Sequence, residues 1–299
     1  MMLKVAAPKR PQLSLSLGCN SARQTILQQR YMAYPLSVSP LFRREESAAD
    51  RTPSKRAYLY RMNTSPGLLA GDALEVSMQL EAGSQLYLAD QSALKVHQMT
   101  EKDTYSTVRY DVKLSKNAML EFLPEPLILF EDAALEQTTE IVLDEEAGVC
   151  WGEIVLPGRL ARGEKYQFRR YLTKTLVRSV DGKLWFAETM NLVGKGNLLV
   201  HSPLFASASV LGTLVLILPR SIAASQALKT LSDRIDGMST SSLDLASSVL
   251  PNDRGLFVRA MSETTREMTA GFKVALNEVR SLQGQNPLPY GLWVEKKER

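Results

Sequence analysis

Histidine and cysteine are scarce in this sequence, which has only two of each in 299 residues. Cys19 and Cys150 lie far apart and form no CxxC pair, so they provide neither a disulfide framework nor a redox motif. We therefore expect a reducing, cytoplasmic setting. Closed sites for late transition metals are built from imidazole and thiolate. A metal handled by this chain would mainly meet carboxylate, carbonyl and water oxygens, with His97 as the exception to consider, and its binding would be weak and labile.

Long apolar runs and familiar catalytic motifs are also absent. The longest apolar run, 210–218, is too short to cross a bilayer, and the N-terminal leucines alternate with serine as in a strand, unlike a signal-peptide core. The sequence has no P-loop, no G-x-S-x-G elbow, no H-E-x-x-H and no G-x-G-x-x-G after a strand. Its net charge of +4 includes no basic block. We expect neither a membrane protein nor a nucleic-acid binder.

Alternation of apolar and polar residues dominates the first two thirds of the chain. The segments 74–81 and 107–114 each place apolar side chains on one face and polar ones on the other, which predicts half-buried strands. Each strand leads through a small polar turn into another apolar strand. The recurrence favours a stack of β units, although an antiparallel sheet with evenly spaced turns gives a similar pattern. The landmark pairs are Leu80 and Leu86, Leu114 and Leu120, and Leu143 and Val149.

Helical periodicity appears only late in the chain. The segment 221–235 has leucine and isoleucine at helical spacing, and 264–282 begins with a Thr-x-x-Glu capping box and carries one apolar stripe. Serine dominates 237–248, which predicts a linker-like stretch, and we expect the charged segment 43–55 to be a mobile loop. The predicted fold is mainly β with about two helices in the C-terminal third, packed as one domain over 1–299.

The segment 120–130, LEFLPEPLILF, holds two carboxylates in an otherwise apolar stretch. Its two prolines make a rigid, non-helical corner. Strand alternation places Glu121 on the same face as Met119 and Leu123. Glu121 and Glu125 therefore lie either on an exposed face or buried beside a partner.

Asp72 and Glu164 are a second pair of isolated carboxylates. Each directly follows a glycine, Gly71 or Gly163, in a short loop. Such a position suits an ordinary turn residue as well as a functional carboxylate, so both roles stay open.

The order of these loops resembles one family, the urease accessory protein UreD, also called UreH. The family pattern has a Gly-Gly-Asp loop, a T-x-x-x-x-K-V-Y segment, an L-E-x-L-P-x-x-x-I-x-F corner and a G-R-x-x-x-G-E loop. This sequence departs from it with Ala70 before the glycine, residues 89–90 where a threonine pair is common, His97 in place of tyrosine and Tyr34 in place of glycine. The matching segments are GLLAGD at 67–72, SALKVH at 92–97, LEFLPEPLILF at 120–130 and GRLARGE at 158–164.

The resemblance implies a non-enzymatic maturation factor without a tightly bound cofactor. Members of the family act with UreF and the GTPase UreG in a chaperone complex that docks on apo-urease and assists nickel insertion into its metallocentre. The implied fold is a β-helix-like stack with two helices, and the implied role is to bridge the partners and to offer an internal polar path for a transient nickel ion. A chain poor in thiolate and imidazole suits a path better than a store, because oxygen ligands release the ion.

The resemblance also suggests roles for particular side chains. Asp72 and Glu164 would line or gate the nickel path, and Glu121 and Glu125 are weaker candidates. Lys95 and Arg159 would pair with carboxylates and hold the loops. His97 is a weak metal candidate that the family pattern does not carry.

Two other functions stay open. A β scaffold that binds a partner and never meets metal would be indifferent to the loop carboxylates. A β-helix hydrolase would use paired carboxylates such as Asp72 and Glu164 as acid and base, but aromatic sugar platforms are lacking near those loops. The candidate UreF contacts are the C-terminal helix and 237–248, and an apolar docking patch predicts poor solubility of the isolated chain.

Overall fold

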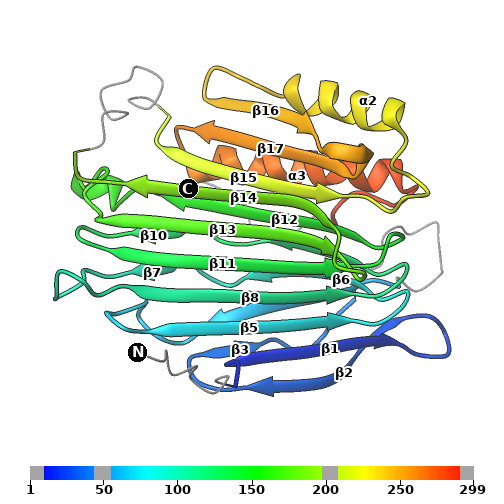
Figure 1. The fold of residues 1–299 in the computed structure, drawn as a ribbon, viewed down its shortest axis with the longest axis horizontal. Coiled ribbons are helices and arrows are strands. Elements are labelled where there is room, and N and C mark those ends of the chain that lie inside the picture. The colour runs from blue at the N-terminus through cyan, green and yellow to red at the C-terminus, as the bar shows by residue number, and fades with distance from the viewer. Residues whose placement is uncertain (1–9, 44–54, 197–207, 290–299) are drawn as a thin grey trace, which may run out of the picture.

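The structure is a computed structural model that describes residues 10–43, 55–196 and 208–289. Strands predominate in these residues, together with the helices α2 (Ser225–Asp236) and α3 (Thr265–Leu282), which confirms the mainly β fold with two helices (Figure 1). The loop expected over 43–55 falls almost entirely outside the described residues. No helix in the described part of the chain is long and apolar enough to span a membrane.

The strands form two layers, which we call the front sheet and the rear sheet after their positions in Figure 1. The front sheet consists, in spatial order, of β14 (Leu184–Val193), β13 (Arg170–Ser179), β11 (Ala134–Leu143), β8 (Ser106–Leu114), β5 (Ala73–Leu80), β1 (Leu13–Cys19) and β2 (Thr25–Met32). The rear sheet consists of β16 (Leu243–Val249), β17 (Gly255–Ser262), β15 (Val210–Ile217), β12 (Gly148–Leu156), β9 (Met119–Leu123), β6 (Gln85–Asp90), β4 (Ala57–Asn63) and β3 (Leu36–Val38). Two short strands, β7 (Leu94–Val96) and β10 (Leu127–Leu129), pair with each other, and β10 also pairs with β12.

From β5 to β13 the chain alternates between the two sheets and stacks in parallel coils. In the front sheet β5, β8, β11 and β13 are parallel neighbours, and in the rear sheet β6, β9 and β12 are. Leu80, Leu114 and Leu143 are register partners, so the predicted repeat is confirmed to the residue. The second member of each landmark pair is in register as well, through Leu86, Leu120 and Val149.

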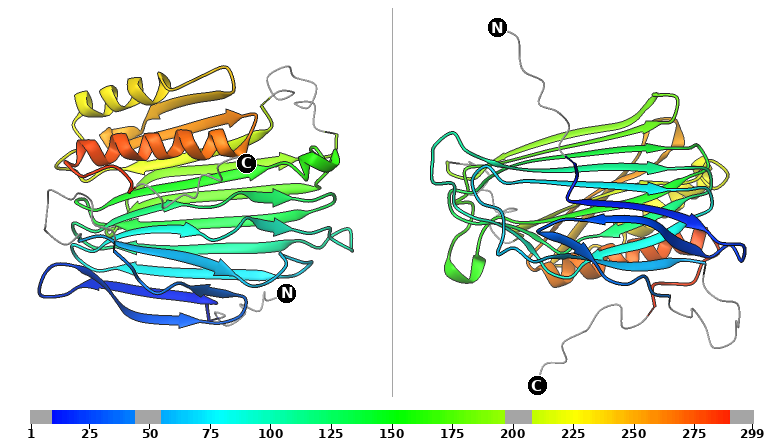
Figure 2. Two further views of the ribbon diagram at one scale, coloured as in Figure 1. Left: turned by 180° about the vertical axis from the view of Figure 1, so that it is seen from behind. Right: turned by 90° about the horizontal axis from the view of Figure 1, so that it is seen from below.

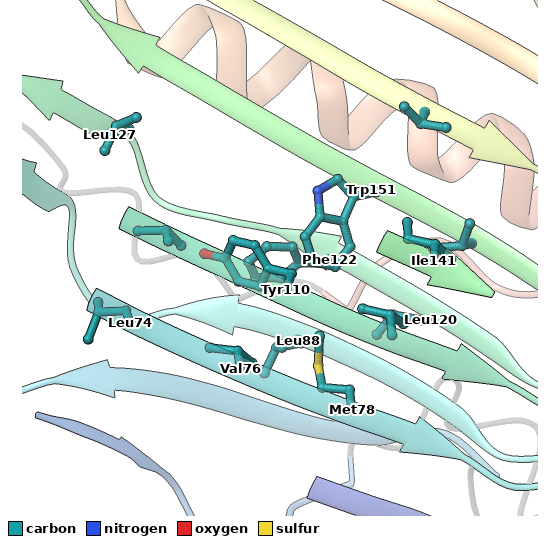
Figure 3. Close-up of a cluster of buried hydrophobic side chains, with 14 of the residues drawn as sticks. Leu74, Val76, Met78, Leu88, Tyr110, Leu120, Phe122, Leu127, Ile141 and Trp151 are labelled. Atoms are coloured by element: carbon teal, nitrogen blue, oxygen red, sulfur yellow. The ribbon is translucent and has the colours of Figure 1, made fainter. Parts of the chain in front are cut away.

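The space between the sheets is filled by the inward faces of these strands. On β5 the inward residues are Leu74, Val76 and Met78, which lie in the same buried cluster as Leu120 from β9 (Figure 3). The Trp151 ring lies in this cluster beside aromatic side chains from both sheets, so aromatic contacts join the two layers. These aromatic neighbours are Tyr110 at 5.1 Å and Phe122 at 4.6 Å between ring centroids.

Both helices cover the outer side of the rear sheet (Figure 2). The hydroxyl of Thr264 accepts the backbone N–H of Glu267 at 3.2 Å, which confirms the capping box at the start of α3. The apolar stripe of α3, with Phe272 and Leu276 among its members, is fully buried in a second cluster between the helices and the sheet. Where the helices lie over β12, β15, β16 and β17, the rear sheet is buried on both faces, and strands there such as β12 and β15 carry more continuous apolar runs than those of the front sheet.

The linker-like stretch expected over 237–248 is wrong for its second half, which forms the edge strand β16. Leu243 and Leu245 point into the helix-side cluster, while Asp244 and Ala246 are exposed. The serine and aspartate residues that suggested a linker lie on the exposed face and edge of a real strand. Composition alone does not separate a polar edge strand from a loop.

Removing side-chain volume from the stacked leucines should destabilise the whole fold. Leu120→Ala deletes a fully buried side chain from the inter-sheet core and should lower the free energy of unfolding by about 2–5 kcal/mol. Leu184→Ala is the matched control, because Leu184 is 47% exposed at the start of β14, and it should change stability by less than about 0.5 kcal/mol. Urea unfolding followed by circular dichroism measures both, and equal losses would contradict the assigned register.

Candidate functional site

Four of the sequence motifs meet at the end of the stack where the rear sheet returns to the front sheet. Leu68 forms a β-bridge with Val96, and Val96 is the register partner of Leu129. The ring of Phe130 lies edge-on to His97, with centroids 5.0 Å apart, and the Arg159 guanidinium lies 4.4 Å above the same ring. The motifs therefore share contacts in three dimensions that their separation in sequence conceals.

The two loop carboxylates are bound to different groups. Oδ2 of Asp72 accepts the backbone N–H of Leu69 at 2.8 Å, so it holds its own turn, and the residue is exposed. Glu164 forms a two-pronged ion pair with Arg159, whose Nε donates to Oε2 at 2.7 Å, and these bonds lower the pKa of the glutamate. Asp72 precedes β5 in the first coil and Glu164 follows β12 in the third. The two carboxylates therefore belong to different coils, and each is held by its own partner.

The remaining candidates at the loop end are Lys95 and His97. Lys95 is exposed on β7 and has no carboxylate within ion-pair distance in the described part of the chain. Nε2 of His97 lies 3.2 Å from the carbonyl oxygen of Pro66. Among the described residues, no group of three or more histidine, cysteine, aspartate or glutamate side chains is arranged to hold a metal ion.

Glu121 is fully buried on the helix-facing side of the rear sheet, the face that strand alternation predicts. Its carboxylate forms ion pairs with Arg56 and Arg280, and Nε of Arg280 donates to Oε1 at 3.0 Å. Burial acts to raise the pKa of Glu121, but the two guanidinium groups outweigh it and hold the pKa below its usual value. Glu121 thus fastens α3 to the sheet and stays charged while doing so.

A second set of polar side chains lies between the two sheets, at positions that sequence reasoning did not single out. Nε of Arg61 donates to Asp90 at 2.6 Å, its second guanidinium nitrogen donates to the same carboxylate at 2.8 Å, and a third bond of 2.8 Å reaches the hydroxyl of Tyr110 across the gap. Burial lowers the pKa of Arg61, and the neighbouring Asp90 more than reverses that effect. Arg61 and Asp90 therefore form a buried ion pair inside the stack.

Glu153 on β12 is a further inter-sheet carboxylate, and none of the described residues gives it a cationic partner. It accepts hydrogen bonds from the amide of Gln137 and, at 3.4 Å, from the hydroxyl of Thr173, both on the front sheet. Within the described chain no lysine or arginine pairs with it. Burial is the main cause that raises the pKa of Glu153 to about 7. A carboxyl group in this setting can bind either a proton or a cation.

Three cavities follow this polar row. The first, about 20 Å³, and the second, about 30 Å³, are both bordered by Arg61, Asp90 and Tyr110. The second also touches Glu125 and Glu153, and Glu153 in turn borders a third cavity of about 230 Å³. Adjacent cavities thus share lining residues, and the row runs along the stacking direction of the coils.

Glu125 is the one carboxylate of the corner segment that reaches this row. It is half-buried, and burial followed by the charge of Asp90 raises its pKa. The sequence did contain a signal for Glu153, because Trp151, Glu153 and Val155 occupy every second position and therefore lie on one face of β12. A charged residue at an inward position of a buried strand is the pattern to look for.

Breaking the buried ion pair should cost far more stability than breaking an exposed one. Glu121→Gln leaves Arg56 and Arg280 buried without a carboxylate, and the free energy of unfolding should fall by about 3–5 kcal/mol. The control is Glu140→Gln, whose side chain is 43% exposed and paired with Arg109, and it should cost less than about 1 kcal/mol. Urea denaturation at neutral pH compares the two, and a loss at Glu121 no greater than that of the control would show that the pair is not essential.

The raised pKa of Glu153 makes a prediction about pH. Below about pH 4.5 this carboxyl is protonated in both the folded and the unfolded chain, and its stabilising effect is fully present. As the pH rises toward 7 the unfolded chain ionises first, so the folded state loses up to about 3 kcal/mol relative to it. The stability difference between the intact chain and Glu153→Gln should therefore shift in favour of the variant from pH 5 to pH 8. A difference that stays constant in urea unfolding at both pH values would contradict the assignment.

Known proteins resemble this chain along nearly its whole length. A family model described as UreD urease accessory protein matches residues 9–293. The urease accessory protein UreD of Trichodesmium erythraeum is 44% identical over 281 residues, which is 93% of this chain and 97% of that protein. The urease accessory protein UreD 2 of Streptomyces griseus is 28% identical over 280 residues, covering 93% and 91%. UreD of Actinobacillus pleuropneumoniae serotype 5b is 37% identical over 159 residues, covering 53% and 57%.

The range matched by the family model, residues 9–293, spans every motif that meets at the loop end and every carboxylate of the inter-sheet row. A 44% identity over almost the full length of both proteins also excludes a match confined to one segment. The chain therefore belongs to the UreD family of urease accessory proteins, which gives it a role in urease maturation.

Proposed function

We propose that this chain acts with UreF and the GTPase UreG in a cytoplasmic complex that docks on apo-urease and assists the insertion of nickel into its metallocentre. Within that complex the chain bridges its partners. It also provides a path along which the nickel ion, its cargo, passes between the two sheets.

The observation that carries the proposal is the row of oxygen-bearing side chains in the interior. Asp90, Glu125 and Glu153 border cavities that share lining residues. A β-sandwich interior normally excludes isolated carboxylates, since burying a charge without a partner is costly. Glu153 has no counter-ion among the described residues, which is the expected arrangement for a group that receives a cation in transit.

The ligand chemistry of the row also favours passage over storage. No histidine or cysteine is among the residues that line the three cavities. Oxygen ligands bind a late first-row cation less tightly than imidazole or thiolate does. A nickel ion held by one carboxylate and a few neutral oxygens can therefore move to the next site.

The two loop carboxylates have a separate role in this proposal. Asp72 and Glu164 lie at the loop end, where Asp72 is exposed and Glu164 would have to leave Arg159 to meet an ion. They are candidates for contacts with the ion outside the stack. Glu121 has no such role, because both of its arginines are buried with it.

The test is urease activation in cells that supply the urease subunits and the other accessory proteins. Glu153→Gln removes the charge of the interior carboxylate, and activation at limiting nickel should fall close to the level seen without the chain. Glu140→Gln, on the outer face of the front sheet, is the matched control and should activate normally. Copurification with tagged UreF should be unchanged in both variants, which separates a blocked path from a lost complex.

Each outcome of this experiment decides one part of the proposal. Normal activation by Glu153→Gln at every nickel concentration would show that the interior row is not used and would favour a bridging scaffold without a metal role. Full activation in the absence of the chain would overturn its part in maturation. The double variant Asp72→Ala with Glu164→Ala, compared in the same cells, tests the loop end separately.

A further inference from the structure

A further polar contact between the sheets lies beyond Glu153. Glu188 on β14 and Arg259 on β17 form an ion pair, and the rings of Phe186 and Phe257 meet beside it with centroids 5.0 Å apart. β14 is the final strand of the front sheet, and the rear sheet continues past it through β15, β17 and β16 (Figure 1). The pair therefore joins the two sheets across the gap that is left where the front sheet ends.

The largest of the three cavities lies at this gap. Glu153 and Arg259 both border it, one from β12 and the other from β17. Its remaining walls are mainly apolar side chains of the two sheets, and the hydroxyl of Thr213 is the one further polar side-chain group among the residues that line it. These apolar residues include Val155, Met190, Leu192, Leu211 and Met261. An ion that crosses the cavity would leave Glu153 at one border and meet Arg259, the partner of Glu188, at the other.

The two partners of the pair differ in exposure. The Glu188 side chain is 14% exposed and the Arg259 side chain 64%. Burial raises the pKa of Glu188, and Arg259 opposes that rise. A largely buried carboxylate needs a cation beside it, whereas a mostly exposed guanidinium loses little free energy when it leaves the ion pair for water. The cation of this pair can therefore be exchanged while the carboxylate stays in place.

We propose that Arg259 is a displaceable plug and that Glu188 is the outermost divalent-cation site of the interior row. An entering Ni²⁺ replaces the guanidinium on Glu188, and Arg259 turns into solvent. From Glu188 the ion crosses the cavity to Glu153, and an ion leaving the chain follows the same steps in reverse. The inference rests on the proposed nickel path, but it concerns a separate step, the exchange of one cation for another on Glu188.

Direct binding of Ni²⁺ to the full-length chain, copurified with UreF, tests the exchange without urease. Equilibrium dialysis followed by metal analysis gives the affinity and the number of ions bound. Arg259→Gln should tighten Ni²⁺ binding about two- to fivefold, because the competing cation is gone and an exposed ion pair is worth a comparable factor. Glu188→Gln should lose one bound equivalent, and Glu188→Asp should keep it.

Arg109→Gln is the matched control, because Arg109 is also a half-exposed arginine paired with carboxylates, on the outer face of the front sheet. It should leave Ni²⁺ binding unchanged. Equal affinities for the intact chain and Arg259→Gln would refute the plug, and an unchanged stoichiometry in Glu188→Gln would refute the site. Circular dichroism of each variant confirms that the fold is kept.

The result is distinguishable from a failure of the nickel path itself. If Glu153→Gln blocks activation while Arg259→Gln binds Ni²⁺ like the intact chain, the path stands and the plug is wrong. If Glu188→Gln loses its bound ion while Glu153→Gln activates urease normally, the cation site stands and the interior path is wrong.

Discussion

The in-register parallel stacking of the coils is the constraint on which the rest of the structure depends. Side chains at equivalent positions of successive parallel strands lie one above another at the strand spacing of about 4.8 Å. Leu80, Leu114 and Leu143 build one such column and seal the core between the sheets. The same rule acts on polar residues. Once a few inward positions are polar, stacking brings them into a row along the axis, and no special loop is needed to assemble them.

The buried charges meet the cost of desolvation in different ways, and these differences indicate their roles. Glu121 has two arginines, which fix α3 onto the rear sheet. Asp90 has one arginine that is itself held by Tyr110. Glu153 has only neutral donors and an elevated pKa. A carboxylate that is already neutralised has little to gain from a passing cation, whereas one that lacks a partner has much to gain.

Much of the fold was readable from the sequence, because its signals are local. The leucine landmarks gave the stack, the Thr264–Glu267 box gave the start of α3, and period-two alternation gave the face of Glu121. The row of polar side chains between the sheets could not be predicted from the sequence in the same way. Asp90 and Glu153 become neighbours of one set of cavities only after β6, β9 and β12 are paired in register. The prediction for the edge strand β16 was wrong for another reason, because the exposed face of this strand has the composition of a loop.

The two sheets are unequal in extent, and this inequality explains where the interior opens. The rear sheet can extend beyond β12 because α2 and α3 cover its outer face and supply a second core. The front sheet has no such cover in the described chain and ends at β14. Beyond that strand, the described residues place no further strand opposite the rear sheet. The inter-sheet core therefore ends at this edge, where side chains of β14 and β17 cover it. An aromatic pair closes the apolar part of the edge, and the Glu188–Arg259 pair closes the part that continues the polar row.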